Sequence, residues 1–203
     1  MNSYKMKISL VNLSDANDKQ KDLLMLTKKE NRMIPNMYRA MVNSPGLLDS
    51  YMHGYKKFRI ESGFTPTEQE VILLTISAEN NCSYCMAAHS ILADTVSKVP
   101  LEVTESIRNN TKISDDKLRG LSAFVSTMVN KRGLPDENEV QAFLNSGYAE
   151  GHILDIILAI SVKTISNYTN HVFKTELDTV FKARKWSAYK VSRSILNFFR
   201  SLV

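Results

Sequence analysis

The two cysteines of this chain stand three positions apart, in the segment CSYCMAAH at residues 82–89. His89 follows the second cysteine by four positions, and Glu70 precedes the first by twelve. A C-x-x-C pair can cycle between a dithiol and a disulfide, and the thiolate is the reactive species. A nearby histidine can accept or return a proton near neutral pH. These residue types point first to redox chemistry at sulfur, with Cys82, Cys85, His89 and Glu70 as the candidate residues.

Two helices must position these side chains. The sequence TPTE at residues 65–68 indicates a helix start, with threonine as N-cap, proline at the first helical position and glutamate completing a capping box. An apolar run at residues 71–78 forms the body of this helix, and the asparagine pair at 80–81 is a break signal. A second helix is predicted over about residues 82–96.

The second helix gives the cysteines a favourable setting. Residues three and four positions apart share a helix face, so Cys82, Cys85 and His89 can lie together. Both sulfurs fall in the first turn, where the helix dipole and unpaired N–H groups favour a thiolate. Glu70 belongs to the preceding helix, and only tertiary packing can bring it to the site.

Two other interpretations of the cysteine pair stay open. A C-x-x-C pair can be half of a zinc site, but structural zinc needs four ligands. The remaining candidate ligands are His89, Glu70, His53, His152 and His171. The cysteines can also be buried and inert. We expect neither a metal nor another cofactor.

The spacing also resembles a known family. Glutamate, eleven residues, C-x-x-C, three residues and histidine is similar to the signature of alkylhydroperoxidase D and its relatives in the carboxymuconolactone decarboxylase-like superfamily. The segment at residues 81–89 resembles the peroxidase-related branch in particular. The likeness extends over about residues 35–181, through NSPGLL at 43–48, DIILAI at 155–160, NYTNH at 167–171 and TELD at 175–178.

This resemblance implies a thiol-dependent peroxidase or disulfide oxidoreductase that reduces hydroperoxides. In the family, the residue matching Cys85 is oxidised to a sulfenic acid, and the one matching Cys82 resolves it as a disulfide. The residues matching Glu70 and His89 form a proton relay. The resemblance further implies regeneration by a dithiol or lipoyl-type protein reductant, and a homo-oligomer, either a trimer or a hexamer.

Tyr84 departs from the pattern of alkylhydroperoxidase D proper, which has a relay histidine at this place. A phenol titrates near 10, so Tyr84 cannot do the same job near neutral pH. The full relay and the lipoyl-linked reductant are therefore open questions for this chain. Two rival functions also remain: a non-redox decarboxylase of the same superfamily, and a redox-sensing or zinc-binding module without turnover.

The rest of the chain predicts an all-α fold, a single-domain bundle of the alkylhydroperoxidase D-like type with about eight helices. Further helices are expected near residues 35–42, 45–62, from 100, 114–133, 136–145 and 149–172. Residues 6–13 alternate loosely, as in a short strand or an extended arm. We divide the chain into a partly mobile arm (1–30), the helical domain (31–181) and a basic amphipathic helix (182–203).

Composition limits the function classes. The chain has 203 residues, of which 43% are hydrophobic and 23% charged, and its net charge is +5. These values suit one globular domain. Cysteines three apart do not staple a secreted fold, and the N-terminus lacks a signal-peptide core, so we expect a cytoplasmic protein. No segment is long and apolar enough to span a membrane. We expect the basic tail to pack on the protein rather than to bind nucleic acid.

Overall fold

The computed structural model describes residues 4–186, which are all-α and contain no strand, with eight helices of at least seven residues. This confirms the predicted fold class. The elements, in chain order, are α1 (Asp18–Asn31), α2 (Asn36–Met41), α3 (Pro45–Glu61), α4 (Pro66–Glu79), α5 (Ser83–Leu92), a π-helical turn (Ala93–Ser97), α6 (Leu101–Asn109), α7 (Asp116–Asn130), α8 (Glu137–Asn145), α9 (Gly151–Phe173) and the 3-10 helix η2 (Thr179–Arg184).

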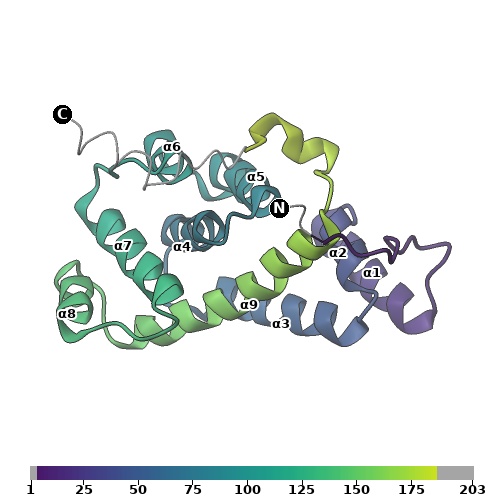
Figure 1. Cartoon of the computed structure of the whole chain (residues 1–203), viewed down its shortest axis with the longest axis horizontal. Helices are drawn as coiled ribbons and strands as arrows, with labels where there is room; N and C mark the ends of the chain where they lie inside the picture. The colour runs from purple at the N-terminus through teal and green to yellow at the C-terminus, as the bar shows by residue number, and fades with distance from the viewer. Residues whose placement is uncertain (1–3, 187–203) are drawn as a thin grey trace.

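Helix α4 is the centre of the core. Every residue from Glu68 to Ser77 is buried, so this helix has no solvent face. A helix that is apolar on most sides must be covered on all of them, and α4 packs against α5, α6, α7 and α9. Figure 1 shows α4 enclosed by these helices, with α8 lying beyond α7. The predicted capping box at its start is present, with Thr65 and Glu68 bonded reciprocally.

Helix α9 is the longest element and lies along α3 and α4 (Figure 1). The two helices α3 and α9 approach closely at Gly54, where an added Cβ would stand 2.6 Å from Cγ1 of Val162. Because of this close contact, α3 and α9 border the same space, which lies beside α5. The site described below occupies that space.

The N-terminal region is more ordered than the sequence pattern suggested. Residues 18–31 form helix α1, which we did not predict because it is polar and buries only Leu24 and Thr27. The preceding extended segment docks on the same chain, since Met6 N–H donates to the Val172 carbonyl at 2.8 Å. The division of the chain into arm, domain and tail stays a prediction.

Two further expectations concern helix ends. Helix α7, expected over residues 114–133, begins after the cap residue Asp115, because the carboxylate of Asp115 accepts the Leu118 N–H. The basic helix expected over residues 182–203 falls mostly on residues 187–203, outside the described residues, and residues 182–184 belong to η2. Within residues 4–186, no helix has the length and apolar character needed to cross a membrane.

Candidate functional site

Helix α5 presents the cysteine pair at its N-terminus. Cys82 is the N-cap residue and Cys85 lies in the first turn, as the sequence predicts. Asn81 has φ of 54°, in the left-handed region. This sharp turn leaves only three residues between the end of α4 and the start of α5. Both cysteines are free thiols that are almost fully buried. Cys82 and Cys85 approach each other to 3.3 Å, so a small rearrangement would bring their sulfurs to the bonding distance of a disulfide.

Cys85 has polar partners from helix α9. The amide Nδ2 of Asn170 donates to its sulfur at 3.3 Å, and the Ser166 hydroxyl oxygen lies 3.9 Å from the same sulfur. Burial opposes ionisation of Cys85, but the hydrogen bond with Cys82 and the charge of Lys163 outweigh it, so the pKa of Cys85 falls well below its usual value. The pKa of Cys82 rises, because its hydrogen bond with Cys85 favours the protonated form. Cys85 is therefore the more acidic thiol of the pair.

Tertiary packing does bring Glu70 to His89. The Nδ1 atom of His89 lies 2.9 Å from Oε2 of Glu70, and both side chains are buried. The other carboxylate oxygen accepts a hydrogen bond from Arg59 of helix α3. Arg59 is itself held by the Tyr55 hydroxyl, at 3.0 Å from Nε and 2.7 Å from Nη2. Glu70 thus links α3, α4 and α5 at one point.

The charges of this group set the protonation of His89. Burial raises the pKa of Glu70, but His89 and Arg59 outweigh burial and bring it below its usual value, so Glu70 is a carboxylate. Burial and the Lys163 charge lower the pKa of His89. A neutral His89 beside a carboxylate carries its proton on Nδ1, since Glu70 can only accept. Its Nε2 is left as a proton acceptor.

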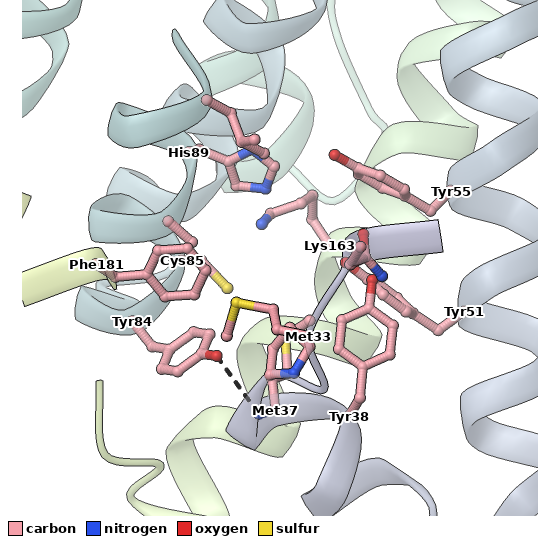
Figure 2. Close-up of a pocket in the computed structure, with 14 residues that line it drawn as sticks. Met33, Met37, Tyr38, Tyr51, Tyr55, Tyr84, Cys85, His89, Lys163 and Phe181 are labelled. Atoms are coloured by element: carbon pink, nitrogen blue, oxygen red, sulfur yellow. Dashed lines mark hydrogen bonds between the residues drawn. The ribbon is translucent and has the colours of Figure 1, made fainter. Parts of the chain in front are cut away.

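A cavity of about 190 Å³ opens beside these residues. Figure 2 shows Cys85 and His89 on one side of it, three tyrosines, Tyr38, Tyr51 and Tyr55, on the other, and Lys163 between them. The whole lining is Asn31, Met33, Pro35, Met37, Tyr38, Tyr51, Tyr55, Tyr84, Cys85, Ala88, His89, Leu92, Lys163 and Phe181. Cys82 is not part of the lining, so a molecule in the cavity meets the sulfur of Cys85 first.

Tyr84 does not take the place of a relay histidine. Its hydroxyl donates to Oδ2 of Asp178 at 2.5 Å and accepts a weak bond from the Met37 N–H at 3.5 Å. Burial and the bond to Asp178 raise the pKa of Tyr84, so it is a neutral phenol. Asp178 also accepts the Asn36 N–H. Tyr84 therefore ties α5 to α2 and to the segment after α9, and its ring forms part of the cavity wall.

Sequence reasoning did not predict several parts of this site. Arg59, Lys163, Ser166 and Asn170 come from helices far from the C-x-x-C segment in sequence. A lysine within the apolar sequence of α9 is the one local signal, since a buried charge needs a special reason. Within residues 4–186, no three His, Cys, Asp or Glu side chains gather so as to hold a metal ion.

Comparison with known proteins shows which solved structures share this fold. No family model and no curated protein matches the chain. Solved structures do match. The alkylhydroperoxidase AhpD core of an uncharacterized peroxidase-related protein from Ralstonia eutropha superposes with a TM-score of 0.75 at 18% identity, covering 86% of this chain and 93% of that one.

The chain has the AhpD-core fold. An uncharacterized peroxidase-related protein from Silicibacter sp. gives a TM-score of 0.72 at 18% identity, over 91% of this chain and 99% of that one. The debrominase Bmp8, as a cysteine-to-alanine variant in complex with 2,3,4-tribromopyrrole, gives 0.73 at 15% identity, over 90% and 97%. The resemblance predicted from Glu70, Cys82, Cys85 and His89 is therefore confirmed at the level of the fold.

Proposed function

We propose that this protein is a thiol-dependent oxidoreductase that reduces hydroperoxides with Cys85 as the attacking sulfur and Cys82 as the resolving one. The observation that carries the proposal is the position of Cys85. Its sulfur lines the cavity, its pKa is lowered, and the second thiol approaches it from behind at 3.3 Å. Peroxidase-related proteins of the same fold support the assignment.

The chemistry starts with the ionised sulfur of Cys85. His89 takes a proton from solvent at Nε2 as the hydroperoxide binds, and Glu70 stabilises the resulting imidazolium through Nδ1. The thiolate then attacks the terminal oxygen of the hydroperoxide, the O–O bond breaks, and Cys85 becomes a sulfenic acid. The departing alkoxide takes this proton from Nε2 of His89 and leaves as an alcohol.

The second half of the cycle uses Cys82. Its sulfur attacks the sulfur of the Cys85 sulfenic acid, and the hydroxyl group leaves with the Cys82 proton as water. The Cys82–Cys85 disulfide is then reduced by thiol exchange with an external dithiol, which is oxidised in turn. We propose a dithiol or lipoyl-type protein as this reductant. The cycle needs a reducing compartment, which favours the cytoplasm.

The cavity favours an organic substrate over hydrogen peroxide. Its volume of about 190 Å³ compares with roughly 30 Å³ for one water in the liquid, and aromatic and methionine side chains make up much of its wall. A hydroperoxide with an apolar body would fill this space and bury apolar surface, whereas hydrogen peroxide would leave most of it to water.

The aromatic wall also favours a second candidate, thiol-dependent dehalogenation. Tyr38, Tyr51 and Tyr55 can stack against an aromatic ring held over Cys85. In that reaction a ring carbon–bromine bond becomes carbon–hydrogen, bromide and a proton are released, and the two thiols become a disulfide. The fold shared with the debrominase supports this alternative. The carboxymuconolactone decarboxylase-type and redox-sensor functions have no such specific support.

We also propose that the protein works as a homo-oligomer, either a trimer or a hexamer. One face of helix α9 leaves apolar side chains exposed at helical spacing: Leu154, Ile157, Tyr168 and Val172. A second copy would remove this surface from water. Light scattering on the purified protein measures the stoichiometry directly.

The functional test compares substrates on the reduced protein with dithiothreitol present. Cumene hydroperoxide, hydrogen peroxide and 2,3,4-tribromopyrrole are supplied separately, and peroxide consumption and bromide release are measured. Cys85→Ser should abolish the activity, whereas Ser83→Ala, an exposed position in the same helical turn, should preserve it. Bromide release without peroxide consumption would move the assignment to the dehalogenase. Inert thiols with all three substrates would refute both functions.

A further inference from the structure

Lys163 is an unusual residue for the middle of a protein. It lies on helix α9, its side chain is fully buried, and its Nζ has no hydrogen-bond partner among the described residues. A buried ammonium group without a partner is costly unless an opposite charge stands close to it. The groups around the cavity must therefore include the negative charge that balances Lys163.

The other acidic groups of the site are already accounted for. Among residues 4–186, no carboxylate lines the cavity, although Lys163 does. Glu70 is bound on one oxygen by Arg59 and on the other by His89. Burial raises the pKa of Tyr51, and it raises the pKa of Tyr55 to about 12, so these phenols are neutral near pH 7.

Cys85 is the remaining source of negative charge. Figure 2 shows the Lys163 side chain extending across the cavity with its nitrogen directed toward His89 and Cys85. Asn170 and Ser166 belong to the same helix α9 as Lys163, and both lie at the sulfur. One face of α9 thus supplies a hydrogen-bond donor, a hydroxyl and a cation to a single thiol.

We propose that Lys163 is the counter-ion of the Cys85 thiolate and holds that thiol in its ionised form in the resting protein. Lys163 is a positioning residue in this scheme, since it acts through Cys85 and takes no part in bond making. The inference rests on the proposed function only for the choice of Cys85 as the reacting sulfur. The counter-ion role explains why Lys163 is buried without a hydrogen bond.

The arrangement has a consequence for the redox cycle. Formation of the Cys82–Cys85 disulfide removes the thiolate and leaves Lys163 without an opposite charge. Lys163 therefore favours the reduced state over the oxidised one. A disulfide whose reduced form is stabilised is readily reduced, which suits a protein that must be regenerated after every turnover.

The test follows the ionisation of Cys85 without any peroxide. The rate of alkylation of Cys85 by iodoacetamide is measured against pH, with the modified cysteine located by mass spectrometry. The titratable or charged groups facing Cys85 are Cys82, Tyr84 and His89 on α5, Tyr38 on α2, Tyr51 and Tyr55 on α3, and Lys163 on α9. Only the last of these is changed, by Lys163→Met, which keeps most of the length of the side chain and removes the charge.

The midpoint of alkylation should move up by about one pH unit or more in Lys163→Met, so that alkylation at pH values below the wild-type midpoint slows about tenfold. The rate at high pH should stay the same. Lys163→Gln should shift the midpoint in the same direction, and Lys163→Arg should retain most of the wild-type midpoint. Lys56→Met, which removes an exposed charge that does not line the cavity, should leave the midpoint unchanged.

An unchanged midpoint in folded Lys163→Met and Lys163→Gln would overturn the inference. A rate lowered equally at every pH would do the same, because it would show a structural role only. Failure of the proposed function is separate: a shifted midpoint in a protein that consumes no peroxide keeps the counter-ion and removes the peroxidase. Peroxide turnover with an unshifted midpoint would keep the peroxidase and remove the counter-ion.

Discussion

Glu70→Gln is the substitution that probes the site most deeply. The carboxylate of Glu70 is fully buried and binds His89, the guanidinium of Arg59 and, at 3.4 Å, the hydroxyl of Ser97. Glutamine has nearly the same shape, keeps one acceptor oxygen and removes the negative charge. The change therefore leaves the charge of Arg59 without its opposite and leaves the His89 ring without the group that fixes its tautomer.

The magnitude follows from what each partner loses. Removing one member of a buried ion pair costs about 3–5 kcal/mol of folding free energy. Arg59 keeps its bonds to Tyr55 and Gln69, and its side chain is 20% exposed. We therefore expect a loss near the lower end, about 3 kcal/mol at neutral pH. The rate of Cys85 oxidation by hydroperoxide should fall about 10²-fold as the proton relay fails.

The loss of stability should depend on pH in one direction. The folded protein lowers the pKa of Glu70, so its contribution is fully present above the unfolded value of about 4.3. It disappears as the pH falls through the folded pKa. The difference in unfolding free energy between wild type and Glu70→Gln should be largest near pH 7 and should shrink below about pH 4.3.

The assay is urea unfolding of wild type and variant at several pH values. Glu61→Gln is the matched control, because Glu61 is an exposed carboxylate on α3 paired with Lys57. Its loss should be no more than about 0.5 kcal/mol. A loss below about 1 kcal/mol for Glu70→Gln, similar to that of the control, would refute the ion pair inferred from Glu70 and its partners.

The remaining predictions concern the reacting groups. Cys82→Ser should leave a sulfenic acid on Cys85 after one equivalent of hydroperoxide, and mass spectrometry after dimedone labelling detects it. Absence of the label on Cys85 would contradict the order of attack. His89→Gln should slow oxidation of Cys85 by about 10²-fold in stopped-flow measurements. An unchanged rate would reduce His89 to a structural residue.

The local part of this site could be read from the sequence because it depends on short-range rules. Residues 65–68 contain a complete capping box, and the structure has it. The spacing of Cys82, Cys85 and His89 fixes one helix face. Each of these features is determined within one or two turns of helix, where side-chain and backbone hydrogen bonding is specific.

The remainder depends on tertiary packing. Nothing near Arg59 in the sequence indicates that it meets Glu70, since the contact is made only when α3 and α4 cross. Asn170 reaches Cys85, and Lys163 lines the same cavity, because α9 packs against both α3 and α5. Helix α1 was missed for another reason: it is polar along most of its length, so its sequence lacks the apolar stripe that marks a packed helix.

The most direct test of the account is the fate of the two thiols after reaction with an organic hydroperoxide. The reduced protein is mixed with one equivalent of cumene hydroperoxide, quenched with an alkylating reagent and mapped by mass spectrometry, then returned to dithiothreitol and challenged again. The account predicts rapid loss of both thiols, an intramolecular Cys82–Cys85 disulfide and repeated cycling. Two alkylated, unreacted cysteines after this treatment would contradict it.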